Sequence, residues 1–166
     1  MTTKKIIIAT VVGAVVLFLF DGALQAIPNF GVRAVERLET NQLTTGEFSE
    51  LANSMAYIAT EKTVSFVATK EADYYNLSRF FAIEFFSAFA IAMVFALLFA
   101  KITFADLGDR IWLTFGFSLI AGFAIHLPYF NWWGFSMAYT VGVVSKTTIG
   151  WLLVAFIQNR LIYKIK

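Results

Sequence analysis

Four long apolar stretches dominate this chain and limit what it can fold into. They run from residue 6 to about 27, 80 to 100, 111 to about 127, and 134 to 157. A helix of about 20 apolar residues crosses the hydrocarbon core of a bilayer. Hydrophobic residues make up 59% of the 166 residues and charged residues only 14%, more apolar surface than a globule of this size can bury. We therefore expect an all-α fold, a four-span transmembrane helical bundle forming a single membrane domain over residues 1–166.

The charges beside these stretches predict how the chain is oriented, because short cytoplasmic loops are rich in Lys and Arg. The basic residues at the two chain ends and around the 101–110 loop are Lys4, Lys5, Lys101, Arg110, Arg160, Lys164 and Lys166. The short loop over residues 128–133 has no charge. We predict that both termini and the 101–110 loop are cytoplasmic and that the segment 28–79 is extracytoplasmic. The first stretch follows two lysines as a signal peptide would, but residues 21–26 make a poor cleavage site, so we expect a retained helix.

Aromatic residues agree with this orientation, since Trp and Tyr gather at the two membrane surfaces. The predicted interfacial anchors are Tyr74, Tyr75, Trp112, Trp132 and Trp133. Trp112 falls at the inner boundary and the other four at the outer boundary.

The extracytoplasmic segment carries a helix signal. Residues 44–47 have the Thr-x-x-Glu spacing of a capping box. Apolar residues then recur at steps of three and four at Phe48, Leu51, Met55, Ile58 and Ala59, which predicts an amphipathic helix. Such a helix would pack on the outer ends of the bundle or at the lipid interface. The alternative is a docking surface for a partner or a lid over an outer cavity.

Each span has small residues at steps of four, and these positions share one helical face. The predicted packing residues are Gly13, Ala88, Ala92, Ser118, Gly122, Gly142 and Gly150. Small residues mark the side on which membrane helices approach closely.

The same faces carry the ionisable groups of the spans: Asp21, Glu84, His126 and Lys146. Ionisable residues in membranes nearly always point inward. Counted at ~1.5 Å per residue, three of them share a layer near the outer side, and the long Lys146 stem can reach it. We predict that Lys146 pairs with Asp21, Glu84 or both. The predicted periphery of this intramembrane polar cluster is Gln25, Asn131 and Tyr139.

Two interpretations of the cluster remain open. The charges can form a buried network that fixes the packing of four similar helices. They can instead form a proton relay, an ion site, or a site for a small anion or substrate open to the outside. A lysine that faces two carboxylates is a coupled system whose protonation could switch.

The remaining chemistry is sparse, so we expect no enzyme. With no cysteine and one histidine, thiolate metal sites, cysteine nucleophiles and multi-histidine metal sites are excluded, and we expect no metal or other cofactor. A haem on His126 would need Met or a His of another chain as its second ligand. The net charge of +2 gives no indication of nucleic-acid binding.

The spans KKIIIATVVGAVVLFLF, IWLTFGFSLIAGFAIHLPYFNWWGF and GWLLVAFI resemble those of small four-helix integral membrane proteins that recur in bacterial genomes. The resemblance is architectural. It implies the same topology and a bacterial inner membrane, and it carries over no functional residues.

The preferred function is therefore a non-catalytic accessory or structural subunit of a membrane protein complex, with lipid and other integral membrane subunits, or further copies of itself, as partners. The alternative is a small oligomeric transporter or an ion- or proton-conducting protein that uses the Asp/Glu/His/Lys cluster.

Overall fold

The computed structural model describes residues 2–25, 55–59, 61–62, 64–68, 70–74, 76–104 and 106–163. Within them the chain forms α1 (Thr3–Gln25), a hairpin of β1 (Met55–Ala59) and β2 (Val64–Ala68), and a short 3-10 helix η4 (Ala72–Tyr74). Three further long helices follow: α2 (Leu77–Lys101), α3 (Leu107–Trp133) and α4 (Met137–Tyr163). All four long helices have the length and apolar composition needed to cross a membrane, which defines a small multi-pass membrane protein.

Polar residues set the helix boundaries. Asn76 caps α2 by accepting a hydrogen bond from the Arg79 N–H at 3.1 Å, and Asp106 caps α3 by accepting one from the Asp109 N–H at the same distance. Gly134 ends α3 in the left-handed region at φ 69°, where a glycine has no Cβ to strain the backbone.

The third helix is longer than the sequence predicted. We expected residues 128–133 to form a loop, but α3 continues through Pro128 to Trp133. Proline removes one backbone donor from a helix, yet membrane helices tolerate it because neighbouring groups satisfy the freed carbonyl. The loop between α3 and α4 is thereby confined to residues 134–136.

The predicted amphipathic helix is wrong over residues 55–59, which form strand β1 instead. This strand pairs antiparallel with β2, with Met55 opposite Ala68 and Ala59 opposite Val64. The β2 sequence VSFVA is rich in β-branched and aromatic residues, which favour strands. Strand pairing across a short connection therefore prevails over the helical spacing of the apolar residues. The first part of the predicted helix, including Phe48 and Leu51, lies outside the described residues.

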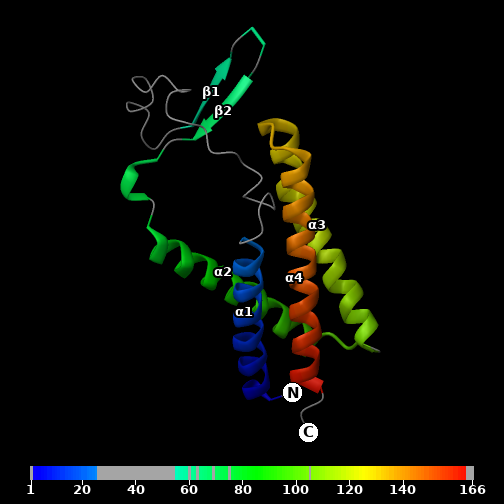
Figure 1. Ribbon diagram of the computed structural model, residues 1–166. Helices are drawn as coiled ribbons and strands as arrows, with labels where there is room; N and C mark the ends of the chain where they lie inside the picture. Colours follow the sequence, from blue (N-terminus) through cyan, green and yellow to red (C-terminus); the bar gives the residue numbers. More distant parts are fainter. Residues whose placement is uncertain are drawn as a thin grey trace.

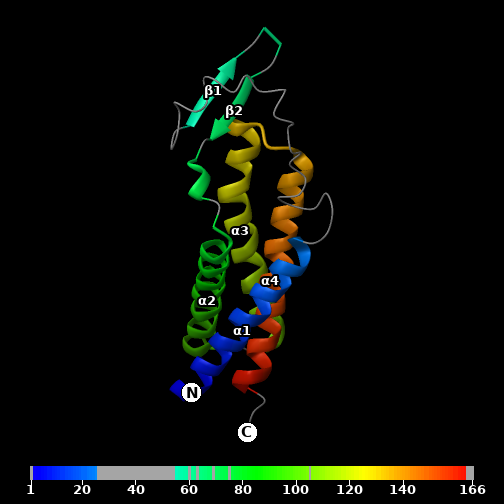
Figure 2. The same cartoon turned by 60° about the vertical axis from the view of Figure 1, so that its left-hand side comes forward.

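The four long helices pack in an open row, in the order α2, α1, α4, α3. The α1 helix packs on both α2 and α4, and α3 packs on α4, whereas the contact between α2 and α4 is small. Figure 1 and Figure 2 show that α1 begins and α4 ends at the same end of the molecule, while the β1–β2 hairpin lies at the opposite end. A row of this kind leaves α2 and α3 as its two outer members.

The small-residue faces are where the helices meet. Ala9, Ala88, Ala92 and Ala96 are at most 3% exposed, as is Ser118 on α3. Large apolar residues such as Phe86, Trp112 and Trp132 remain more than two-thirds exposed, with 70%, 72% and 74% of their surface free. Their exposure fits a lipid-facing surface, because lipid solvates large apolar side chains as well as a protein core does.

Candidate functional site

The structure joins two of the predicted ionisable residues directly. The Lys146 Nζ lies 3.4 Å from the Asp21 Oδ1, and each side chain is only 16% exposed. This pair links α4 to α1. Gly150, one turn further along α4, permits the approach, because a Cβ there would lie 2.9 Å from the Leu17 Cδ1 and 3.2 Å from the Phe20 ring.

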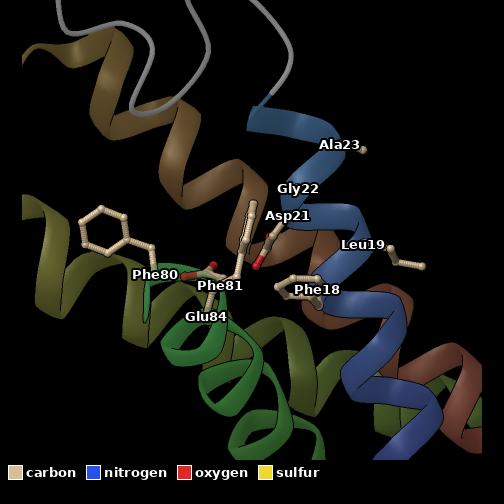
Figure 3. Close-up of a pocket in the computed structure, with 8 residues that line it drawn as sticks. All are labelled: Phe18, Leu19, Asp21, Gly22, Ala23, Phe80, Phe81 and Glu84. Carbon is tan, nitrogen blue, oxygen red and sulfur yellow. The ribbon is translucent and has the colours of Figure 1, made fainter. Parts of the chain in front are cut away.

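Glu84 shares a cavity with Asp21 between the C-terminal part of α1 and the N-terminal part of α2. The cavity has a volume of about 580 Å³. It is lined by Phe18, Leu19, Asp21, Gly22, Ala23, Phe80, Phe81 and Glu84. Figure 3 shows the two carboxylates turned toward the space between the helices, with the rings of Phe18 and Phe81 beside them. Glu84 itself is exposed, and among the described residues it has no ion-pair partner.

His126 belongs to a different group. Its ring makes edge contacts with Tyr129 at 5.9 Å and Tyr139 at 6.2 Å between centroids, and Tyr139 stacks on Phe135 at 4.9 Å. The His126 Nδ1 is buried and has no hydrogen-bond partner among the described residues. The predicted polar cluster thus divides into an ion pair with a cavity on α1, α2 and α4, and an aromatic group on α3 and α4.

The predicted periphery divides in the same way. Tyr139 joins the His126 group, whereas Asn131 is exposed near the end of α3. Gln25 is the last residue of α1. Among the predicted anchors, Trp112 lies near the start of α3, Trp132 and Trp133 at its other end, and Tyr74 in η4; Tyr75 lies outside the described residues.

A three-helix junction that the sequence analysis missed lies closer to the chain ends. Gln158 on α4 is fully buried, and its Nε2 donates hydrogen bonds to the Ala92 carbonyl on α2 at 2.7 Å and the Ala9 carbonyl on α1 at 3.3 Å. Gly13 makes room for it, because a Cβ at Gly13 would lie 2.9 Å from the same Nε2. A single amide therefore ties three helices together. The step-of-four face of α4 runs on from Gly150 to residues 154 and 158, so continuing that pattern would have found it.

A second buried clamp holds α3 to α4. The Arg110 Nη1 donates to the Asn159 Oδ1 at 3.1 Å and to the Asp106 carbonyl at 2.9 Å. Arg110 is only 7% exposed although it lies in the first turn of α3. From the sequence, Arg110 was expected only as one of the charges that orient the chain in the membrane. Asn159, a polar residue two positions beyond the predicted fourth span, was the available signal.

An apolar groove separates the outer members of the row. Its volume is about 570 Å³, and its walls come from α2 and α3, with Trp151 of α4 also lining it. The lining residues are Ala90, Ile91, Val94, Phe95, Leu98, Phe117, Ile120, Ala121 and Trp151. Every one of these side chains is apolar apart from the indole N–H, so the groove holds no charged group.

No group of three or more His, Cys, Asp or Glu side chains that could hold a metal ion occurs in the part of the chain that the structure describes. No protein-family model matches the chain, and the comparisons with curated proteins and with solved structures find no match. The site is therefore interpreted from its own geometry.

Proposed function

We propose that this protein is a non-catalytic subunit of a membrane protein complex, and that one transmembrane helix of a partner subunit packs into the groove between α2 and α3. The open row of helices carries this proposal. In a closed four-helix bundle α2 and α3 would cover each other, whereas here an apolar groove separates them.

The groove suits a helix because small residues occur on both walls. Ala90 lies on α2 and Ala121 on α3. Small side chains let membrane helices approach closely, and packing contacts rather than hydrophobicity hold such helices together in lipid. The buried clamps at Gln158 and at Arg110–Asn159 support the same role, because they hold the walls of the groove in place without any partner.

The proposal also includes the orientation. The distribution of Lys and Arg supports cytoplasmic termini in a bacterial inner membrane. The β1–β2 hairpin would then lie outside, at the end of the bundle away from the chain ends (Figure 2). There it could contact an extracytoplasmic part of the same partner.

Site-specific crosslinking tests the groove, and the absence of cysteine makes every introduced thiol unique. Val94→Cys and Ile120→Cys place a thiol on each wall, and Met93→Cys and Phe123→Cys are controls on the same helices at nearly the same depth but outside the groove. All four side chains are exposed, so labelling with a benzophenone maleimide is comparable. After irradiation in native membranes, both groove variants should give the same protein adduct, crosslinked through a transmembrane peptide of one partner. Equal adducts from the controls, or lipid adducts alone at the groove, would contradict the proposal.

A second candidate function is a small oligomeric transporter or an ion- or proton-conducting protein. The observation that favours it is the charged group of Asp21, Lys146 and Glu84 beside a cavity within the predicted span. An intramembrane ionisable residue is by default a hypothesis for a functional site. Transport assays in proteoliposomes separate the subunit function from the transporter function. If the protein is a transporter, Glu84→Gln should lose transport, whereas binding of a partner subunit should be unchanged.

A further inference from the structure

We infer that the cavity between the C-terminal part of α1 and the N-terminal part of α2 binds an amphipathic organic cation, such as a quaternary ammonium or phosphonium compound. This inference is independent of the partner groove between α2 and α3, which lies on other residues. It rests on the charge balance, the lining and the size of the cavity.

The charge balance leaves one carboxylate uncompensated. Asp21 and Glu84 both line the cavity, and Lys146 lies within ion-pair distance of Asp21. Glu84 lines the same cavity as Asp21, and it has no ion-pair partner among the described residues. Two acids and one base leave a net negative charge when all three are ionised. A cationic ligand would compensate it, whereas an anion would be repelled.

The lining selects an organic cation over a metal ion. Phe18, Phe80 and Phe81 line the same cavity as the carboxylates. The Phe18 and Phe81 rings hold each other edge to face at 6.2 Å between centroids, with an interplanar angle of 76°. Aromatic faces attract cations through the ring quadrupole, and aromatic cages recognise quaternary ammonium groups in this way. A hydrated metal ion would instead require a set of oxygen ligands, and the described residues supply only the two carboxylates here.

The size and position of the cavity fit the same ligand class. Its volume of about 580 Å³ lies in the range of small-molecule pockets. Leu19 and Phe81 in its lining are 62% and 54% exposed, so a ligand with an apolar body can enter from the surrounding lipid. Its apolar groups would lie against the Phe18 and Phe81 rings while its charge faces Glu84 (Figure 3).

Tetraphenylphosphonium binding to the full-length protein in detergent tests the inference, with neutral triphenylphosphine oxide as the uncharged analogue. The wild type should bind the cation saturably and the neutral analogue at least about 10-fold more weakly, because only the cation can form a charge-assisted contact with the Glu84 carboxylate. Glu84→Gln keeps the shape of the side chain and should weaken cation binding by about 10-fold or more on the same grounds. Phe81→Leu should weaken it by about 3- to 10-fold through the lost cation–π contact.

Matched controls separate binding from folding. Asp73→Asn removes an exposed acid outside the cavity, and Phe86→Leu removes a lipid-facing ring one turn along α2. Both should bind the cation like the wild type. Affinities are compared only among variants whose circular dichroism spectra and gel-filtration profiles match those of the wild type. If Glu84→Gln does not fold, the cation affinities of Phe81→Leu and Phe86→Leu still test the inference, because only the first should be weakened. Equal affinity in Glu84→Gln and wild type, equal binding of the neutral analogue, or no saturable binding at all would overturn the inference.

Discussion

The three-helix junction at Gln158 gives the sharpest prediction about what holds this fold together. Its Nε2 donates to carbonyls on two other helices, at 2.7 Å and 3.3 Å. Those carbonyls, of Ala92 and Ala9, also accept the regular bonds of their own helices, so removing the amide leaves neither of them without a donor. Interhelical hydrogen bonds in membranes contribute about 0.6 kcal/mol on average and about 1.7 kcal/mol at most. Gln158→Leu, which keeps most of the volume, should therefore lower the free energy of unfolding by about 1–2 kcal/mol.

Truncation at the same position should cost more. Gln158→Ala loses the two bonds and leaves a cavity at a fully buried site, so we expect about 3 kcal/mol, within the range of large-to-small core substitutions. Gly13→Ala should cost about 1–3 kcal/mol by overpacking, because its Cβ would lie 2.9 Å from the Gln158 Nε2 and 3.2 Å from both the Ala92 Cβ and the Val154 Cγ1. In the double variant Gly13→Ala with Gln158→Ala, the clash between the new Cβ and the Gln158 Nε2 disappears. Its destabilisation should be smaller than the sum of the single effects by about 1 kcal/mol.

Unfolding by SDS in mixed micelles, followed by circular dichroism, measures these differences. Leu19→Ala is the control, because Leu19 is 62% exposed and truncating it should change stability by less than about 0.5 kcal/mol. Strict additivity of Gly13→Ala and Gln158→Ala, or a neutral Gln158→Ala, would refute the reasoning that the amide fills the space left by the glycine.

Further predictions concern the ion pair and the orientation. Lys146→Met leaves Asp21 next to Glu84 without its cation and should destabilise the protein by about 2–4 kcal/mol, whereas adding Asp21→Leu should recover most of that loss in the same unfolding assay. If the double variant Lys146→Met with Asp21→Leu is as unstable as Lys146→Met alone, the ion pair with Asp21 is not the reason that Lys146 stabilises the protein. Thr103→Cys, in the turn between α2 and α3, should resist a membrane-impermeant maleimide in intact cells and react after permeabilisation. Asn131→Cys, near the C-terminal end of α3, should react in intact cells, and the reverse pattern would mean an inverted orientation.

The spans and their packing faces could be predicted from the sequence, because helical periodicity places residues four apart on one side and small residues mark close approach. Ala88, Ala92, Ser118 and Gly122, which lie on such faces, are buried in the structure. The order of the helices could not be predicted, since a small-residue face indicates close contact but not with which helix. For this reason the pairing of Lys146 with Asp21 was one of three open alternatives, beside Glu84 and both carboxylates together. The grouping of His126 with Tyr139 away from Lys146 was not foreseen.

The remaining misses have local causes. Residues 55–59 carry apolar residues at helical spacing, and only a pairing partner several residues later makes them a strand. Pro128 is a helix breaker in water, but α3 continues through it to the glycine that can adopt a positive φ. Gln158 and Asn159 are two polar residues near the end of an apolar span, where a sequence pattern alone does not distinguish buried clamps from exposed end groups.

Native mass spectrometry of the protein released from its own membrane tests the central claim most directly. The chain has a mass of 18.6 kDa. If α2 and α3 receive a helix of a partner subunit, the particle should exceed that mass by at least one further polypeptide, and Ala90→Trp together with Ala121→Trp, which fills the groove from both walls, should release the partner while the chain stays folded. A particle of 18.6 kDa that carries only lipid would contradict the account.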